Sequence, residues 1–240
     1  MKIDLTGQTV LITGAAGGLG QAMAATFSEH GASLILSDLA MGKITEADQT
    51  FATTCDVTDA ASVRAMIAAG VDRFGPIDIA VNNAGISGPH GKLTELSADD
   101  WSRLLAVNLT GLFNSLQAEI PAMRDHGRIL NIASLAGISG APGLAAYAAT
   151  KHGVVGLTRS LAHELKRQKI RVNALCPSFT DTPMLDAMGL EKSRLHSPLN
   201  ALGRFGTAQE MADAALWITS PANSFMTGQA ITLDGGISAL

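Results

Sequence analysis

The stretch TVLITGAAGGLG, residues 9–20, places a short apolar run directly before a cluster of glycines. The run TVLI predicts a buried strand, and the Ala-rich segment after Gly20 predicts a helix. Glycines at such a junction let the backbone turn sharply and approach a pyrophosphate, which the first amides of the helix can bind. Their spacing, Gly-x-x-x-Gly-x-Gly, differs from the GxGxxG fingerprint but occupies the same place after the first strand. The residues expected to contact such a ligand are Gly14, Gly17, Gly18, Leu19 and Gly20.

Further short apolar runs alternate with helical patterns along the rest of the chain. We expect strands at Thr9–Ile12, Ser33–Ser37, Phe51–Cys55, Ile77–Val81, Arg128–Ile132, Arg171–Leu175 and Ala230–Leu233. We expect helices at about Gly18–His30, Asp59–Phe74, Ser97–Met123, Ala145–Gln168 and Ala208–Thr219. Runs that are apolar throughout are typical of parallel strands covered on both faces. The alternation therefore predicts an α/β fold, a Rossmann-type doubly wound parallel sheet of about seven strands, in a single domain over residues 1–240.

Composition and charge exclude several classes of protein. Of the 240 residues, 47% are hydrophobic and 16% are charged, which is typical of a globular domain with a sizeable core. The net charge of −4, with scattered Lys and Arg, argues against a nucleic-acid partner. No apolar stretch approaches the ~18 residues that span a bilayer, and the glycine cluster follows the N-terminus too soon for a signal peptide. We therefore expect a cytoplasmic protein with no membrane partner, in which Cys55 and Cys176 are buried thiols.

Small and polar residues follow the ends of the other predicted strands. Asp38 follows the second strand, 18 residues beyond Gly20, where a carboxylate can accept hydrogen bonds from the ribose hydroxyls of an adenosine. The third and fourth strands end in residues that would join the same site, namely Asp56, Val57, Asn83, Ala84 and Gly85. Since ligands of open α/β sheets bind at the carboxyl ends of the strands, these features together predict a dinucleotide site.

Three residues after the fifth strand have the pattern of an acid–base site. Ser134 ends that strand, and Tyr147 and Lys151 lie four residues apart, on one face of a predicted helix. Hydride transfer at a carbon requires a proton to move at its oxygen, and a free Tyr, with a pKa of about 10, is a poor base at neutral pH. A neighbouring ammonium lowers that pKa, and a serine hydroxyl can hold the substrate oxygen. Read alone, the same pair is an ordinary helix aromatic beside a solvated lysine.

Taken together, these motifs resemble those of the short-chain dehydrogenase/reductase family over essentially the whole chain. Within the family they are similar to the 3-oxoacyl-carrier-protein-reductase-like group, which includes sugar, hydroxy-acid and cyclic-alcohol dehydrogenases. The matching segments are TGAAGGLG (13–20), Asp38, Asp56-Val57, NNAG (82–85), Asn108 within VNLTG, Ser134, Tyr147 with Lys151, and Pro177 after Asn173.

The resemblance implies roles that the residues alone do not reveal. Asn108 completes a catalytic tetrad with Ser134, Tyr147 and Lys151 by holding a water that relays protons to Lys151. The resemblance also implies that Tyr147 and Lys151 contact the cofactor and that Lys151 binds the nicotinamide ribose. Further cofactor contacts are implied at Pro177 and at one of two threonines, Thr180 or Thr182, which the sequence does not separate. The chain departs from the family pattern after Pro177, where Ser178 replaces the frequent glycine.

The sequence thus predicts an NAD-dependent oxidoreductase that acts on a secondary alcohol or ketone of the hydroxyacyl, sugar or cyclic-alcohol class. NAD is expected rather than NADP, because Asp38 would repel the extra phosphate and Lys43 is the only cation nearby in sequence. A 3-oxoacyl-thioester reductase is a more specific form of this prediction. The alternatives are an epimerase or dehydratase with bound NAD, and an NAD-binding sensor or regulatory protein of the same fold.

Three further expectations concern metals, loops and assembly. The six histidines show no ligand spacing, so no metal is expected. The stretch Asp181–Asn200 lacks periodicity and is expected to be a mobile substrate loop that closes over cofactor and substrate. The resemblance implies a homodimer or homotetramer in which the helices at 97–123 and 145–168 pair across a two-fold axis. The C-terminal segment ITLDGG would supply the other interface.

Overall fold

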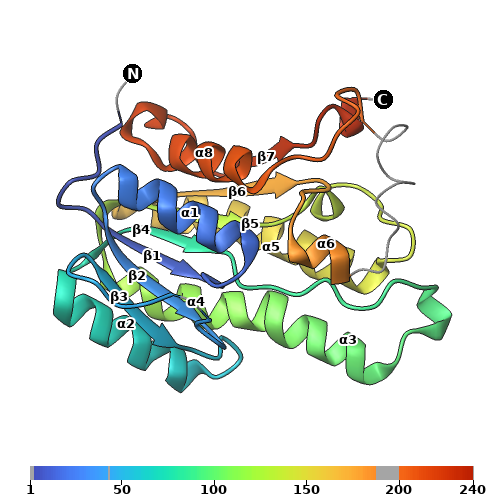
Figure 1. The fold of residues 1–240 in the computed structure, drawn as a ribbon, viewed down its shortest axis with the longest axis horizontal. Coiled ribbons are helices and arrows are strands. Elements are labelled where there is room, and N and C mark those ends of the chain that lie inside the picture. The colour runs from blue at the N-terminus through green and yellow to red at the C-terminus, as the bar shows by residue number, and fades with distance from the viewer. Residues whose placement is uncertain (1–2, 43, 188–199, 240) are drawn as a thin grey trace.

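The computed structural model describes residues 3–42, 44–187 and 200–239. Within them, seven strands form one sheet in the order β3-β2-β1-β4-β5-β6-β7 (Figure 1). Each neighbouring pair is parallel. The strands are β1 (Thr9–Thr13), β2 (Ser33–Asp38), β3 (Thr50–Thr54), β4 (Ile77–Asn82), β5 (Met123–Ile132), β6 (Arg171–Pro177) and β7 (Ala230–Leu233). All seven predicted strands are confirmed, and the fold is the expected doubly wound α/β sheet.

The strand order reverses between β1 and β4, and this reversal places the predicted ligand site. Thr13, the last residue of β1, pairs with Ser37 of β2 on one side and with Asn82 of β4 on the other. Ligands of open α/β sheets bind outside the carboxyl ends of strands at such a reversal. The glycine turn after β1, Asp38 at the end of β2 and the NNAG segment after β4 therefore meet at one edge of the sheet.

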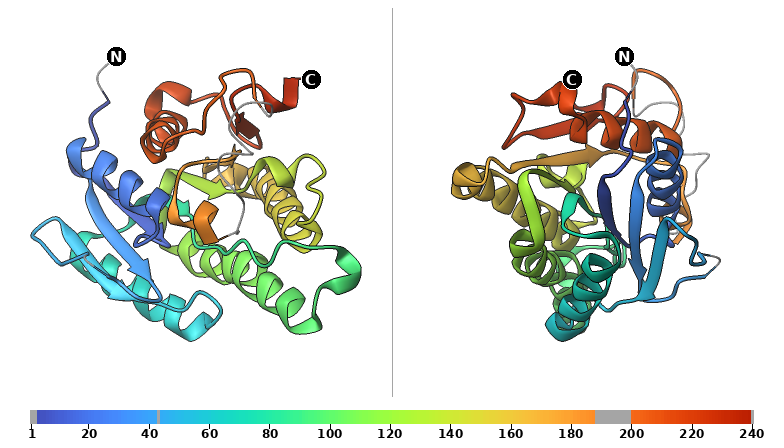
Figure 2. Two further views of the ribbon diagram at one scale, coloured as in Figure 1. Left: turned by 45° about the vertical axis from the view of Figure 1, so that its right-hand side comes forward. Right: turned by 90° about the vertical axis from the view of Figure 1, so that its left-hand side faces the viewer.

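Helices cover both faces of the sheet (Figure 2). The α-helices of the described residues are α1 (Gly18–Glu29), α2 (Ala60–Phe74), α3 (Ala98–Leu105), α4 (Gly111–Glu119), α5 (Ala145–Glu164), α6 (Pro183–Ala187) and α8 (Ala208–Thr219). Phe27 of α1 and Met211 of α8 belong to the core on one face, and Val63 of α2 and Val154 of α5 belong to the core on the other. No helix of the described segments is long and apolar enough to cross a membrane.

The segment Ser97–Met123 differs from the single long helix that we expected. It divides into α3, a π-helical turn at Ala106–Thr110 and α4. Pro121 lacks a backbone N–H and stands in the short 3₁₀ turn that ends this helical segment. The chain then enters β5 at Met123, five residues before the predicted start, and the pairing of β5 with β4 shifts register there. The pattern of apolar residues did not reveal these breaks.

The predicted substrate loop, Asp181–Asn200, is described only at its two ends. At its start lies the short helix α6, where the sequence has no periodic pattern. Residues 188–199, and with them the expectation of a loop that closes, lie outside the described residues. Thr180, just before the loop, forms a parallel bridge with Gly206, six residues after it.

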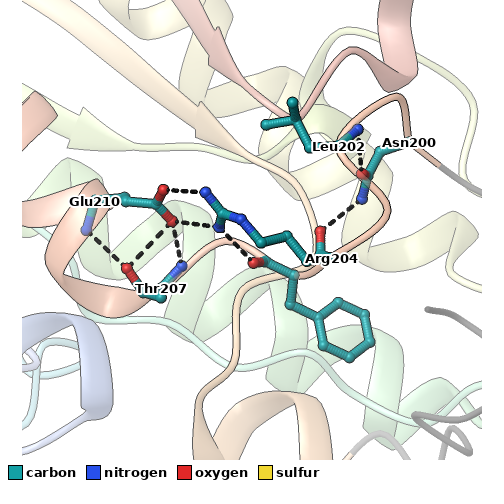
Figure 3. A network of polar contacts seen from close by, with 6 residues as sticks. Asn200, Leu202, Arg204, Thr207 and Glu210 are labelled. Atoms are coloured by element: carbon teal, nitrogen blue, oxygen red, sulfur yellow. Dashed lines mark hydrogen bonds and ion pairs between the residues drawn. The ribbon is translucent and has the colours of Figure 1, made fainter. Parts of the chain in front are cut away.

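A polar network fixes the chain between residue 200 and α8 (Figure 3). Arg204 donates to both carboxylate oxygens of Glu210, at 2.6 and 2.9 Å, and Asn200 donates to the carbonyl of Arg204 at 2.8 Å. Thr207 and Glu210 form the capping box that the sequence predicts at the start of α8. Because these side chains are exposed, the ion pair adds little stability, and the main effect of the network is to fix the path of the backbone.

Candidate active site

Glycines allow the turn after β1 to pack tightly against the NNAG segment. Gly14 has a φ of +65°, and a Cβ atom there would lie 2.8 Å from the Cα of Ala84. A Cβ at Gly20 would collide with the carbonyl oxygen of Gly14. Gly17 is the cap of α1 and offers no side chain to the first amides of the helix. This uncapped helix start, with a favourable dipole, fits the pyrophosphate of a dinucleotide.

The NNAG segment is tied directly to this turn. The side-chain amide of Asn83 donates to the carbonyl oxygens of Thr13 and Gly14, at 3.1 and 2.8 Å. In return, the hydroxyl of Thr13 accepts hydrogen bonds from the backbone N–H groups of Asn83 and Ala84, both at 3.2 Å. Asn83 therefore holds the glycine turn in place, a contact that its position after β4 did not reveal.

The residues that follow β2 and β3 lie at the same edge of the sheet. The carboxylate of Asp38 accepts a hydrogen bond from the backbone N–H of Ala16, at 2.9 Å. Asp56 accepts from both the N–H and the hydroxyl of Thr58, at 2.9 and 2.7 Å, and so shapes the turn after β3. The carbonyl of Val57 accepts from the side chain of Asn114, at 2.9 Å. Asp38 thus borders the glycine turn, while Asp56 and Val57 are engaged in local structure.

Ser134, Tyr147 and Lys151 come together at the carboxyl end of β5. Ser134 forms a hydrogen bond with the side chain of Tyr147. The ammonium nitrogen of Lys151 lies 5.6 Å from the centroid of the Tyr147 ring. It also donates to the carbonyl oxygen of Ile132, at 2.8 Å, which fixes the buried side chain. The predicted acid–base group is therefore assembled in space as its sequence pattern indicates.

Burial dominates the acid–base properties of this group. It raises the pKa of Tyr147, and the hydrogen bond from Ser134 opposes that rise. Burial also lowers the pKa of Lys151 to about 8. The sequence led us to expect that Lys151 would lower the tyrosine pKa, but the larger influence within the described chain is loss of solvent. The hydroxyl form of Tyr147 is therefore favoured at neutral pH.

Cys176 is a neighbour of this group that the sequence did not single out. The thiol is fully buried at the end of β6, and its charge would interact with both Tyr147 and Lys151. Burial raises its pKa to about 11, so it stays a neutral thiol. Cys55 is also buried and free, as expected.

Asn108 lies in the π-helical turn and faces the NNAG segment. The backbone N–H of Gly111 bonds to the carbonyl of Ala106, five residues earlier, and π-turns of this kind often occur at functional sites. The side chain of Asn108 accepts from the N–H of Ile86 at 2.8 Å and donates to its carbonyl at 2.9 Å. A Cβ at Gly85 would lie 3.3 Å from Asn108 and 3.5 Å from the Lys151 nitrogen. Glycine therefore lets the segment pass between these two residues.

Residues that follow β6 also lie close to the glycine turn. A Cβ at Gly18 would lie 3.1 Å from the side chain of Thr182 and 3.2 Å from Pro183. Thr180 is buried and donates to the carbonyl of Ser178, at 3.1 Å, whereas Thr182 is half-buried. Pro177 is buried as the last residue of β6. Of the two candidate threonines, Thr182 is the one in contact with the predicted pyrophosphate turn.

A cavity of about 180 Å³ opens beside Tyr147. Its walls are the segment from Pro89 to Ser97 and the segment from Gly143 to Tyr147. These two segments are joined by a hydrogen bond from the N–H of Gly91 to the carbonyl of Gly143, at 3.0 Å. The lining is mixed: Leu93, Leu96, Leu104 and Leu144 are apolar, and the charged or titratable side chains besides Tyr147 are His90, Lys92, Glu95 and Asp100. In the part of the chain that the structure describes, no group of three potential metal ligands is present.

The sequence and the fold both match known proteins over nearly their full length. A family model described as enoyl-(acyl carrier protein) reductase matches residues 14–238. A 3-oxoacyl-[acyl-carrier-protein] reductase of Thermotoga maritima is 37% identical, over 97% of this chain and 98% of its own length. A trans-4-hydroxycyclohexanecarboxylate dehydrogenase of Sinomonas cyclohexanicum is 38% identical, over 97% of this chain and 93% of its own.

The solved structures agree with this assignment. A 3-ketoacyl-(acyl-carrier-protein) reductase from Brucella melitensis, complexed with NADH, superimposes with a TM-score of 0.89 and is 35% identical. The match covers 98% of this chain and all of that one. The chain therefore belongs to the short-chain dehydrogenase/reductase family of oxidoreductases.

Proposed function

We propose that this chain is an NAD(H)-dependent enzyme that interconverts a secondary alcohol and a ketone, with Tyr147 as the acid–base residue. The observation that carries the proposal is the contact of Tyr147 with Ser134 and Lys151 beside a 180 Å³ cavity. A sensor or regulatory protein of the same fold would not need this group. An epimerase or dehydratase remains the enzymatic alternative.

Each residue of the group has a part in moving a proton. In ketone reduction, the hydroxyl of Tyr147 donates its proton to the substrate oxygen, and in alcohol oxidation the phenolate accepts it. Ser134 donates a hydrogen bond to the same oxygen and so favours the charge that develops there. Lys151 brings a positive charge to the tyrosine ring and is held by Ile132. Asn108 completes the tetrad next to Lys151.

The nicotinamide cofactor, when bound, supplies or accepts the hydride. The residues proposed to hold it are Gly14, Gly17, Gly18, Leu19, Gly20, Asp38, Asp56, Val57, Asn83, Ala84, Gly85, Tyr147, Lys151, Pro177 and Thr182, with Thr180 as the alternative threonine. Support for this assignment comes from the tight turn after β1 and the uncapped start of α1. The contact of Thr182 with Gly18 brings the segment after β6 to the same place.

NAD rather than NADP is proposed because of the charge at Asp38. Its carboxylate lies against the turn, at 2.9 Å from the nitrogen of Ala16, where the adenosine ribose is expected. The residues after it, Leu39 and Ala40, provide no cation. Lys43 lies outside the described residues. The extra phosphate that NADP carries on this ribose would face the carboxylate of Asp38, with no cation from Leu39 or Ala40 to neutralise it.

The substrate is proposed to be a hydroxyacyl compound, a sugar or a cyclic alcohol that fills the cavity beside Tyr147. The leucine side chains of its walls favour a compact hydrocarbon body, and its charged or titratable lining contains both the basic residues His90 and Lys92 and the acids Glu95 and Asp100. The named relatives act on a cyclic hydroxycarboxylate and on 3-oxoacyl thioesters. Reduction of a 3-oxoacyl thioester is therefore the second candidate, favoured by similarity to two proteins with that name.

The test is a panel of cyclic alcohols, sugars, hydroxy acids and acyl thioesters, with each cofactor and in both directions. The proposal expects NADH to form from, or to be consumed with, at least one of these substrates. Tyr147→Phe measured beside the wild type assigns the activity to this site. If no member of the panel reacts while NADH binds, the sensor alternative is favoured instead.

We also propose that the protein is cytoplasmic and forms a homodimer or homotetramer. Phe113, on one of the helices expected to pair, is a large hydrophobic side chain that is 50% exposed. Such a side chain supports an interface where it belongs to a contiguous apolar patch. Light scattering that gives a stable monomer at micromolar concentration would contradict this proposal.

A further inference from the structure

A buried polar cluster lies between the sheet and helices α4 and α5. The side-chain amide of Asn82 donates to Glu119, at 2.8 Å, and to Asn131, at 3.1 Å. Asn131 in turn donates to the hydroxyl of Thr158, at 2.9 Å. Glu119, Asn131 and Thr158 are fully buried, and Asn82 is 6% exposed. A buried carboxylate is costly compared with an apolar side chain of the same size, so its presence calls for a reason.

A small cavity joins this cluster to the predicted catalytic residues. Its volume is about 10 Å³, close to the space that one water molecule needs. Asn82, Asn108, Ser115 and Lys151 all line it. Lys151 has three N–H donors and uses one of them on Ile132, so it can donate to a water in this cavity.

The hydrogen bonds of the cluster determine which group of the Asn82 side-chain amide is available to bond a water in the cavity. Both N–H donors of Asn82 are taken, one by Glu119 and one by Asn131. Its carbonyl oxygen, by contrast, is buried and has no hydrogen-bond partner among the described residues. A water that accepts from Lys151 and donates to this oxygen would satisfy both groups.

We propose that Glu119 is a positioning residue for catalysis, which fixes the Asn82 amide so that its carbonyl oxygen anchors the water beside Lys151. This inference rests on the proposed function, because it assigns a support to the proton path of the same site. Glu119 does not line the cavity beside Tyr147, and its hydrogen bond is to Asn82, the residue before the predicted cofactor residue Asn83. It acts through Asn82 alone.

The ionisation of Glu119 makes this role measurable. Burial raises its pKa to about 7, and the hydrogen bond from Asn82 opposes the rise. These are the only two causes of the shift, so no charged group among the described residues contributes. Across the cavity the titratable groups are Lys151, with Tyr147 and Cys176 beyond it. The ionised carboxylate accepts a charge-assisted hydrogen bond, which is about twice as strong as a neutral one, so Asn82 is held best above pH 7.

The experiment is the pH dependence of kcat for ketone reduction, where Tyr147 stays protonated throughout. The wild type should show kcat rising about fivefold as Glu119 ionises, the effect of one weakened hydrogen bond of about 1 kcal/mol. Glu119→Gln resembles the protonated acid, so its kcat should stay at the low value on both sides of that pH. KM for cofactor and substrate should not change, since Glu119 is remote from both.

Thr158→Val is the matched control. It removes a buried hydrogen bond at the far end of the same cluster but leaves Glu119 and Asn82 paired. It should lower Tm and keep the inflection in kcat. The inference is wrong if Glu119→Gln keeps the wild-type profile, or if Thr158→Val loses the inflection to the same extent.

Two measurements keep the test decisive. Infrared titration of the wild-type enzyme follows the carboxyl band of Glu119 without any substitution. If kcat shows no inflection where that band titrates, the inference fails even if Glu119→Gln does not fold. Tyr147→Phe separates the two proposals: an active Phe variant overturns the proposed function. If Tyr147→Phe is inactive but Glu119→Gln keeps the wild-type pH profile of kcat, only the role of Glu119 is overturned.

Discussion

The carboxylate of Asp38 accepts a hydrogen bond from the backbone N–H of Ala16, at 2.9 Å, and so stands directly over the glycine turn. This contact connects the end of β2 with the turn after β1, although 22 residues separate the two in sequence. A charge fixed in this place affects any ligand whose phosphates or ribose approach the turn. We therefore expect this side chain to influence the choice between NAD and NADP.

For Asp38, we predict that kcat/KM is at least about tenfold higher with NAD than with NADP. Two like charges about 5 Å apart repel by roughly 2–3 kcal/mol at an effective dielectric of about 20–40. Asp38→Asn removes the charge but keeps an acceptor for Ala16, and it should narrow the preference. Asp38→Ala should narrow the preference for NAD as well, and it also removes the hydrogen bond to Ala16. Leu39→Arg should reverse the preference in favour of NADP. Equal values for the wild type with both cofactors would contradict this role of Asp38.

For the glycine turn, we predict that Gly20→Ala lowers Tm by roughly 3–10 °C. A methyl group there would collide with Gly14 and Ala15, and overpacking of this kind costs about 1–3 kcal/mol. Gly17→Ala is the matched control for stability, because its Cβ would lie 3.4 Å from the nearest atom, an ordinary contact. Thermal unfolding of both variants checks the prediction, and equal Tm values would count against the tight turn.

For pH, we predict that alcohol oxidation accelerates continuously as pH rises, whereas ketone reduction shows only the step of about fivefold that accompanies the ionisation of Glu119. Burial raises the pKa of Tyr147, so the phenolate that oxidation needs is scarce at neutral pH. Below that pKa, each unit of pH increases the phenolate about tenfold. Initial rates in both directions from about pH 6 to about pH 9 test this sign. Faster oxidation on the acid side would mean that another group is the base.

For Lys151, we predict that Lys151→Met lowers both turnover and NADH affinity. The methionine keeps the length of the side chain but loses the hydrogen bond to Ile132 and the charge beside Tyr147. Stopped-flow rates and fluorescence titration with NADH measure the two effects separately. A variant that binds NADH normally would show that Lys151 does not hold the nicotinamide ribose.

Much of the fold could be predicted from the sequence because its signals are local. The apolar run TVLI and the glycines that follow determine the first strand and its turn through the chemistry of a few adjacent residues. Tyr147 and Lys151 share a helix face by spacing alone. The contact of these residues with Ser134 joins separate parts of the chain, so helix spacing alone does not predict it. It can be predicted once Ser134 is placed after the fifth strand, at the edge of the sheet where the other site residues lie.

The remaining features depend on contacts that spacing does not report. In the π-helical turn, Asn108 bonds to Ile86 and to Thr150 of α5, and β5 starts early where its pairing with β4 shifts register. The pair of Asn82 and Glu119 joins residues 37 positions apart. One signal for it was available: Glu119 follows the buried Leu112 and Leu116 at helical spacing, so it falls on the apolar stripe of α4. A charged residue on such a stripe indicates a buried polar partner, although its spacing does not say which residue that partner is.

The central claim, that Tyr147 is the acid–base residue of an alcohol–ketone oxidoreductase, is tested most directly by Tyr147→Phe. The measurement is turnover with NADH on the best substrate of the panel, together with NADH affinity by fluorescence. The phenyl ring fills the same space without a transferable proton, so turnover should fall by at least ~10²-fold while NADH still binds. Near-normal turnover of the Phe variant would contradict the claim.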